Sequence, residues 1–261
     1  MSTNVGTGTI VFLNGTSSSG KTSVARALRQ VLAEPYFYVA ADQFSAMLPG
    51  QPVDAGPYLA LFSAMHRSLA ALAAAGANVV VDHVVGNKTW LKECVDLLSG
   101  YRVLFVGVLC PPDELERRER ERGDRRIGQA GDQLGFVHAH GLYDLEVDTS
   151  TATPEDCALR IKRRLEAGPP PTAFRQLRDS VFLNDHAGYG WVLFKGAHGE
   201  DVRRLQEDLR RLGYDPGPCD GDFGEQTHVA LRAFQTDKGL KPDGATWTRT
   251  VKALVEALAA L

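Results

Sequence analysis

Near the amino terminus, an apolar run over residues 10–13 leads into a glycine-rich stretch that contains a lysine. Glycines allow backbone N–H groups to close around phosphate oxygens, a lysine can bridge the transferable phosphates, and a threonine hydroxyl can bind Mg²⁺. The strand-like run before the stretch and the amphipathic helical pattern after it are the context that such a loop needs. We therefore predict a nucleoside triphosphate site for ATP and Mg²⁺, in preference to a plain Gly/Ser turn. The stretch fits G-x-x-x-x-G-K-[ST] and consists of Gly15, Thr16, Ser17, Ser18, Ser19, Gly20, Lys21 and Thr22.

Two aspartates follow strand-like runs and could take part in phosphoryl transfer. Asp42 comes after residues 38–41 and opens a short helical stretch, so it should project from the carboxyl end of a strand, where open α/β sheets bind ligands. There it could act as the general base for an acceptor hydroxyl, although a helix N-cap fits the pattern equally well. Asp82 ends the run 79–81 and is predicted to hold Mg²⁺ directly or through water, with a plain cap as the alternative. His83 beside it is interpreted as a packing or pocket-wall residue.

Arginines are concentrated in residues 116–126, where six of them alternate with acids. Most of these side chains are predicted to form i,i+4 ion pairs on a solvated helix. A glycine at position 123 interrupts the helix, and a flexible arginine-bearing segment could close over phosphates as a lid. We predict that Arg122 and Arg125 are its phosphate clamps, and that Thr149, after the last strand-like run, lies beside the adenine.

The composition limits the classes of partner that the chain can have. Its 261 residues are 44% hydrophobic and 23% charged, as in ordinary globular proteins, and the net charge of -3 argues against nucleic acid as the main partner. The four cysteines form no C-x-x-C pair, so neither a zinc site nor a disulfide framework is predicted. The amino terminus lacks a basic region followed by an apolar one, and no run approaches the roughly 18 apolar residues of a membrane span. We therefore expect a cytoplasmic protein without a membrane partner.

Alternating strand and helix patterns must position these residues. Strand-like runs occur at about 9–14, 36–41, 77–82, 102–109 and 143–149, which predicts an α/β fold with a parallel sheet. The last helix of this unit should begin at the N-cap Thr153 and run to about residue 167. We predict a phosphotransferase domain over residues 1–167, a proline-rich linker with a small hairpin over 168–194, and a helical module over 195–261.

Residues 9–166 resemble the chloramphenicol phosphotransferase family of P-loop kinases. The resemblance lies in the loop after Leu13-Asn14, in Asp42, in Val81-Asp82, in Arg122-Gly123-Asp124-Arg125 and in the stretch 143–149. It implies an adenylate-kinase-like strand order and ATP-dependent phosphorylation of a hydroxyl on a small molecule, with Asp42 as general base. Two departures put chloramphenicol itself in doubt: residues 48–60 are shorter than the acceptor-covering region of the family, and His83 stands where the family has an acid.

Residues 196–257 resemble the peptidoglycan-binding-like family, an all-α module, in Leu205-Gln206, Asp220-Gly221, Phe234-Gln235 and Asp243-Gly244. Peptidoglycan binding is not expected, because a kinase needs cytosolic ATP and the sequence shows no export signal. We expect the module to pack on the kinase, to cover the acceptor site or to pair two copies as a homodimer.

Three hypotheses for the function follow from these patterns. The leading one is an O-phosphotransferase that inactivates an antibiotic or another secondary metabolite. The second is a kinase of a cytosolic cell-wall precursor such as a UDP-linked amino sugar, as in zeta-type toxins. The third is a non-enzymatic, nucleotide-dependent wall-sensing protein, which would need Lys21 but not Asp42.

Overall fold

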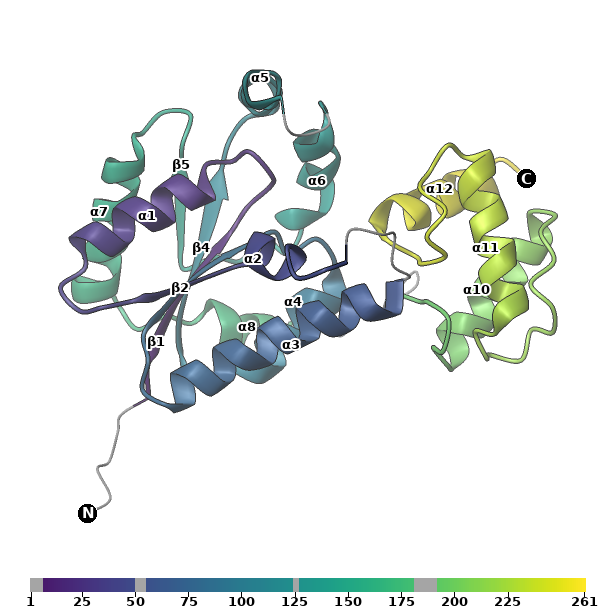
Figure 1. The fold of residues 1–261 in the computed structure, drawn as a ribbon, viewed down its shortest axis with the longest axis horizontal. Helices are drawn as coiled ribbons and strands as arrows, with labels where there is room; N and C mark the ends of the chain where they lie inside the picture. The colour runs from purple at the N-terminus through teal and green to yellow at the C-terminus, as the bar shows by residue number, and fades with distance from the viewer. Residues whose placement is uncertain (1–6, 50–54, 124–126, 181–191) are drawn as a thin grey trace, which may run out of the picture. The chain divides into compact units, whose positions relative to one another are not determined.

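The computed structural model describes residues 7–49, 55–123, 127–180 and 192–261. The chain divides into two compact units: the first contains residues 1–47, 62–86 and 90–183, and the second contains residues 48–61, 87–89 and 184–261. The first unit carries a parallel sheet, and the second carries the carboxyl-terminal helices (Figure 1).

The sheet of the first unit has five parallel strands in the order β2-β3-β1-β4-β5. Its strands are β1 Thr9–Asn14, β2 Phe37–Ala40, β3 Val79–His83, β4 Arg102–Leu109 and β5 Leu145–Asp148. Strands β1 and β3 are almost wholly buried, which explains why they appear in the sequence as unbroken apolar runs. The five predicted strands and the strand order implied by the family resemblance are confirmed. All five carboxyl ends therefore lie on one edge of the sheet.

Helices cover both faces of this sheet (Figure 1). Helices α1 Lys21–Val31 and α7 Pro154–Ala167 pack together on one face, where Leu28 and Ile161 join a core of strand residues. The other face is aromatic: Phe174 of α8 Ala173–Arg178 contacts Phe12 and Phe105. Helices α3 Ala55–Ala74 and α4 Lys88–Leu98 contribute Phe62 and Trp90 to the same aromatic layer.

The first unit has three further helices. Helix α2 Ala41–Ser45 follows β2, helix α5 Pro112–Arg122 follows β4, and helix α6 Gln129–Val137 follows α5. Helix α5 ends at Gly123 in a left-handed conformation, as the predicted interruption requires. Helix α7 begins after Thr153, whose hydroxyl accepts a hydrogen bond from the Asp156 amide, and it ends at the predicted residue. These local signals were sufficient to place both helix ends.

The segment 168–194, predicted to hold a linker and a hairpin, contains helix α8, which belongs to the first unit. The turn of that hairpin falls within residues 181–191, outside the described residues. The predicted domain boundaries stay a prediction.

The carboxyl-terminal helices are α10 Glu200–Arg211, α11 Glu225–Asp237 and α12 Thr248–Ala259, and they share one apolar core. Two glutamines play the same part in successive turns. The Gln206 amide nitrogen donates to Asp220 and Thr227 while its oxygen accepts from the Gly221 amide. In the same pattern, Gln235 donates to Asp243 and Thr250 and accepts from Gly244. The module is thus a structural repeat in which a buried glutamine closes each Asp-Gly turn.

None of the helices in the described part of the chain combines the length and the apolarity that crossing a lipid bilayer requires.

Candidate active site

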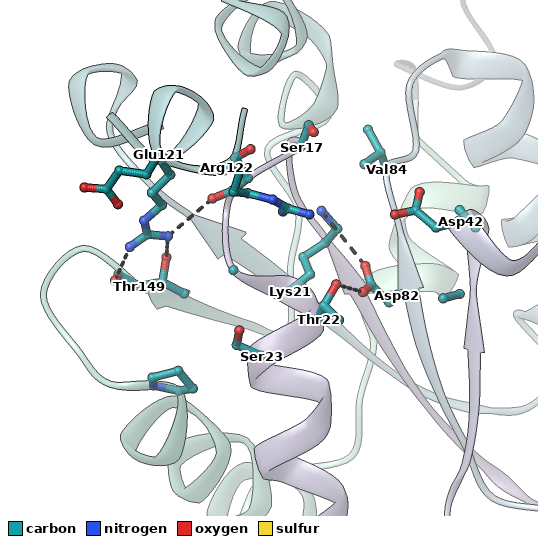
Figure 2. A pocket seen from close by; sticks show the side chains of 16 residues that line it. Ser17, Lys21, Thr22, Ser23, Asp42, Asp82, Val84, Glu121, Arg122 and Thr149 are labelled. Carbon is teal, nitrogen blue, oxygen red and sulfur yellow. Dashed lines mark hydrogen bonds and ion pairs between the residues drawn. The ribbon is translucent and has the colours of Figure 1, made fainter. Parts of the chain in front are cut away.

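A cleft of about 390 Å³ opens at the carboxyl edge of the sheet (Figure 2). It is bounded by the loop between β1 and α1, the ends of β2 and β3, helix α5 and the loop after β5. Of the residues predicted from the sequence, its lining includes Ser17, Ser18, Gly20, Lys21, Thr22, Asp42, Asp82, Arg122 and Thr149. The structure therefore brings together side chains that are up to 132 positions apart, from Ser17 to Thr149. Arg125 lies outside the described residues.

The loop from Gly15 to Thr22 is shaped by residues that tolerate its close contacts and its turns. A Cβ atom at Gly15 would lie 2.4 Å from the Val108 carbonyl oxygen, so only glycine fits there. Gly20 has φ 86°, and Ser18 has φ 61°, an unusual value for a residue with a side chain. The hydroxyls of Thr16, Ser18 and Ser19 are buried without a hydrogen-bond partner among the described residues. Such a polar, unsatisfied cradle fits an anionic ligand.

Lys21 lies at the centre of the cleft and is only 7% exposed. Its ammonium donates to the Thr16 carbonyl oxygen at 2.7 Å and lies 4.0 Å from Asp82 Oδ1. A buried ammonium held close to the loop amides can interact strongly with phosphate oxygens, because little water screens it.

Two oxygen ligands suited to a divalent cation meet beside Lys21. The Thr22 hydroxyl donates to Asp82 Oδ2 at 2.7 Å, and the Tyr38 hydroxyl donates to the same oxygen at 3.0 Å. Burial, and then the neighbouring Asp82, raise the pKa of Tyr38 above its ordinary value, so Tyr38 stays a neutral donor. Hydroxyl and carboxylate oxygens are ligands that Mg²⁺ accepts, commonly together with water and phosphate oxygens. The residues present therefore fit the predicted metal.

Asp42 lies on α2, across the cleft from Arg122 and Thr149 in the view of Figure 2. The N-cap of α2 is Ala40, and the Gln43 side chain accepts from the Ala40 amide at 2.9 Å. The interpretation of Asp42 as an N-cap is therefore wrong. Asp42 is in the first turn of α2 and lines the cleft, where its carboxylate can accept a proton.

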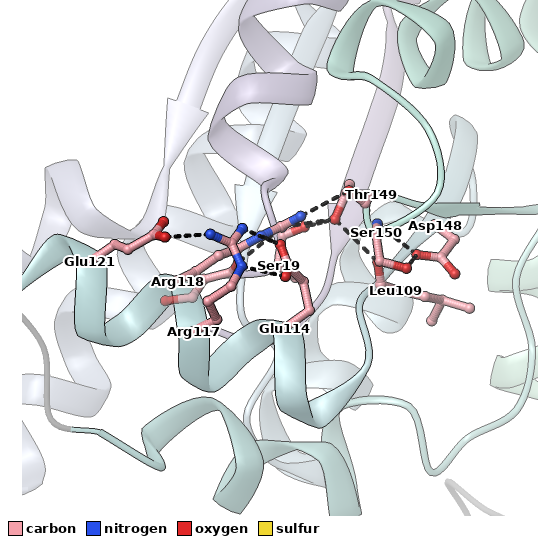
Figure 3. Close-up of polar contacts among 10 residues, drawn as sticks. Ser19, Leu109, Glu114, Arg117, Arg118, Glu121, Asp148, Thr149 and Ser150 are labelled. Carbon is pink, nitrogen blue, oxygen red and sulfur yellow. Dashed lines mark hydrogen bonds and ion pairs between the residues drawn. The ribbon is translucent and has the colours of Figure 1, made fainter.

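Sequence reasoning missed Arg118, the arginine of α5 that is tied to the loop (Figure 3). Its guanidinium donates to the Thr149 hydroxyl at 3.0 Å, to the Thr149 carbonyl at 2.8 Å and to the Ser18 carbonyl at 3.3 Å. It also pairs with Glu114 at 2.7 Å, the i,i+4 pairing that made it look like a surface residue. A helical period starting from the buried Leu115 places Arg118 and Arg122 on one face of α5, and this period was the available signal.

Helices α5 and α6 are joined by the carboxylate of Glu119, which is fully buried. It accepts hydrogen bonds from the Gly128 amide at 2.6 Å and from the Ala130 amide at 2.7 Å. Since these amides start α6, Glu119 holds the first turn of α6 against the end of α5.

Polar side chains also gather around the end of β1, where Asn14 is opposite His83 of β3 and Gly107 of β4 in the register of the sheet. Asn14 donates to the Tyr143 hydroxyl at 2.8 Å, and that hydroxyl lies 2.7 Å from His138 Nδ1. Burial, and then the charge of Lys21, lower the pKa of His138, which favours the neutral ring. Its Nδ1 can therefore accept from Tyr143, which leaves the proton on Nε2.

His83 packs inside the sheet's aromatic layer, in agreement with one of its two predicted roles. Its ring is fully buried, stacks on Phe62 and places Nε2 3.0 Å from Nε2 of His66. His66 Nδ1 in turn lies 2.7 Å from Glu93, which also bonds Ser63. Burial, together with His66 and Lys21, lowers the pKa of His83 well below its usual value, so the ring stays neutral.

We expect acid to destabilise the first unit through His140. Burial, and then the neighbouring His138, lower the pKa of His140 from 6.5 to about 4. Below pH 6.5 the His140 imidazole is protonated in the unfolded chain but stays neutral in the folded chain. The free energy of unfolding therefore decreases as the pH falls from 6.5 towards 4. His140→Asn does not titrate. Between pH 7 and 4.5 this variant should lose about 2 kcal/mol less unfolding free energy than the wild type. Urea titrations at the two pH values measure this difference.

The control for this experiment is His198→Asn, at an exposed histidine of the second unit. An equal pH dependence in the wild type, His140→Asn and His198→Asn would show that the buried ring does not contribute.

Comparisons with known proteins agree with the observed fold. Residues 8–166 match the family model described as "Chloramphenicol phosphotransferase-like protein", and residues 198–254 match "Putative peptidoglycan binding domain". Over 200 residues the chain is 33% identical to the Mycobacterium tuberculosis protein named "Putative O-phosphotransferase Rv2636", covering 66% of this chain and 88% of that protein. The spore cortex-lytic enzyme of Bacillus cereus is 46% identical over 66 residues, which cover 25% of this chain and 26% of the enzyme.

Among solved structures, the tunicamycin resistance protein of Deinococcus radiodurans has a similar fold. The TM-score is 0.50 at 19% identity, with 62% of this chain and 99% of that chain covered. Both resemblances found in the sequence are thereby confirmed. The chain belongs to the chloramphenicol phosphotransferase-like family, whose kinase-type fold it carries together with a carboxyl-terminal domain of the peptidoglycan-binding type.

Proposed function

We propose that this protein is an ATP-dependent O-phosphotransferase that uses Mg²⁺ and phosphorylates a hydroxyl of a small molecule. The observation that carries the proposal is the cleft, in which Lys21, the Thr22–Asp82 pair and Asp42 converge from three strand ends. Membership of a phosphotransferase family supports the same reaction class. Phosphoryl transfer needs these parts: cations for the phosphates, a metal and a base beside the acceptor.

The residues of the cleft divide the reaction between them. The loop amides and Lys21 hold the phosphates and stabilise the charge that develops on them. Thr22 and Asp82 would hold Mg²⁺, which when bound neutralises charge on the phosphate oxygens. Asp42 orients the acceptor alcohol and takes its proton as the oxygen attacks the γ-phosphorus of ATP. The bond from this phosphorus to the β–γ bridging oxygen breaks and ADP leaves, while Arg122 approaches the phosphates from α5.

For the acceptor, we favour an antibiotic or another secondary metabolite, because the family model carries the name of a chloramphenicol phosphotransferase. A nucleotide-linked cell-wall precursor is the second candidate, and the carboxyl-terminal domain favours it, because this domain matches a peptidoglycan-binding model. In both cases we propose that this domain serves the kinase and does not anchor the protein to the cell wall.

One experiment tests the reaction and separates the two candidates. The full chain is incubated with ATP, Mg²⁺ and a panel of hydroxylated antibiotics and nucleotide sugars, and products are screened by mass for one added phosphate. Phosphate on a member of either class identifies the acceptor class. A panel in which no compound gains phosphate, while ATP still binds, would contradict the proposed reaction and support a nucleotide-binding protein without a kinase activity.

Arg118→Ala is expected to weaken the binding of a non-hydrolysable ATP analogue about tenfold or more. The side chain makes charge-assisted hydrogen bonds to Ser18 and Thr149, and without them both loops lose their common anchor. Isothermal titration calorimetry measures the change.

The matched control is Arg117→Ala, at the neighbouring exposed arginine that pairs with Glu114 and Glu121 (Figure 3). It should change the affinity less than twofold, because an exposed ion pair contributes little. Equal effects of the two substitutions would show that the loop contacts of Arg118 do not matter for the nucleotide.

A further inference from the structure

Helix α6 reaches the loop through Gln133, a residue that the assignment of the cleft does not use. The backbone amide of Ser17 donates to the side-chain oxygen of Gln133 at 2.6 Å, across 116 positions of sequence. The Ser17 amide belongs to the set of N–H groups that the loop motif presents to phosphates. A protein oxygen therefore lies where a phosphate oxygen is expected.

The contacts of the loop, taken with the general motif, indicate which phosphate this amide would bind. Ser17 follows Thr16, whose carbonyl accepts from the Lys21 ammonium at 2.7 Å. The Ser18 and Ser19 carbonyls face the other way, towards Arg118 and Thr149. In this motif the lysine reaches the β- and γ-phosphates. The Ser17 amide thus lies at the end of the loop that receives the transferable phosphoryl group.

We propose that Gln133 is a positioning residue that senses the γ-phosphate: its carboxamide and the γ-phosphate compete for the hydrogen bond of the Ser17 amide, so that ATP displaces Gln133 and ADP does not. A phosphate oxygen carries more negative charge than a carboxamide oxygen and is the stronger acceptor. It therefore replaces the carboxamide as the acceptor of the hydrogen bond from the Ser17 amide. The inference rests on the proposed function only in requiring a nucleotide site. It does not depend on the acceptor or on Asp42.

Displacement of Gln133 has a consequence for the arginines. Gln133 lies on α6, and the Glu119 carboxylate holds the start of α6 against α5, which carries Arg118 and Arg122. A change at Gln133 is therefore transmitted to the helix that supplies the phosphate clamp. Helices α5 and α6 would be positioned differently with ATP and with ADP, because only the γ-phosphate of ATP would accept the hydrogen bond of the Ser17 amide.

Gln133→Ala in the full chain tests the competition. Without the internal ligand, binding of AMP-PNP should tighten about threefold to tenfold, the range expected for one neutral hydrogen bond, while binding of ADP should change less than about twofold. Gln133→Asn, whose carboxamide is one methylene shorter, should act in the same direction. Gln129→Ala, one turn earlier on α6, is the matched control and should bind both nucleotides as the wild type does.

Hydrogen exchange gives a second readout that does not need nucleotide. The Ser17 amide should exchange at least about tenfold faster in nucleotide-free Gln133→Ala than in the wild type, and AMP-PNP should protect it in both. Unchanged exchange, unchanged or weaker AMP-PNP binding, or equal changes for AMP-PNP and ADP would each overturn the inference and leave the proposed function standing. A wild type that binds neither nucleotide would overturn both.

Discussion

Lys21→Ala is expected to lower the rate of phosphoryl transfer by about 10³-fold or more. The Lys21 ammonium is buried and is held by the Thr16 carbonyl, so in the proposed reaction its charge would lie beside the phosphates with little reorganisation. Removing one preorganised electrostatic contact of this kind costs about 10²- to 10³-fold, and here the contact is a full charge in a poorly hydrated site. Steady-state assays with the acceptor identified by the panel measure the loss.

Two further variants make this experiment specific. Lys92→Ala removes a partly exposed lysine outside the cleft lining that also pairs with an aspartate, Asp96, and it should leave the rate unchanged. Lys21→Arg keeps the charge but not the compact ammonium, and it should not restore the wild-type rate. Since Lys21 lies 4.0 Å from the Asp82 carboxylate, thermal unfolding of each variant must show that the fold is retained. A folded Lys21→Ala protein with a normal rate would remove this residue from the mechanism.

Asp42→Asn is expected to lower kcat by about 10²- to 10⁴-fold while the affinity for AMP-PNP stays within twofold. Asparagine has nearly the shape of aspartate but cannot accept the acceptor proton. Because Asp42 lines the cleft from α2, whereas the loop amides and Lys21 lie on the β1–α1 side, the substitution should not disturb the phosphates. The split between turnover and nucleotide affinity distinguishes a general base from a nucleotide ligand.

The control is Asp96→Asn, at an exposed aspartate of α4, which should leave kcat unchanged. Asp42 is also the acid in the first turn of α2, where a negative charge stabilises the helix by about 0.3 to 1 kcal/mol. A lowered melting temperature with unchanged kcat would assign this structural role to Asp42 and would remove it from the mechanism as general base.

Most of the fold could be predicted because its signals are local. The loop motif, the apolar runs of the buried strands and the N-cap of α7 each lie within a few consecutive residues, and the structure has them where the patterns indicated. The helix end at Gly123 is of the same kind, since a left-handed terminus favours glycine whatever surrounds it. Backbone preferences act over one or two turns, so short stretches of sequence carry them in full.

The site residues divide in the same way. Lys21, Thr22 and Asp42 follow strand ends, and Asp82 is one of the last two residues of β3. A parallel sheet brings such ends to one edge, so the convergence of these residues could be anticipated. Whether Asp42 caps its helix could not be anticipated from the sequence, because the hydrogen-bond pattern that makes Ala40 the cap exists only in the folded backbone.

Only the folded chain identifies the contacts of three further residues of this region, which are Arg118, Tyr38 and Gln133. Each contacts a partner that is 31 to 116 positions away, and the strand order and the packing of α5 and α6 bring these partners within hydrogen-bond distance. In the sequence, Arg118 is one of six similar arginines, and only its helical spacing from Leu115 distinguishes it from Arg117. Residue order therefore identified the kind of chemistry and the strand ends that hold it. The long-range contacts followed only from the assembled sheet and its helices, because side-chain partners far apart in sequence are selected by packing and not by local preference.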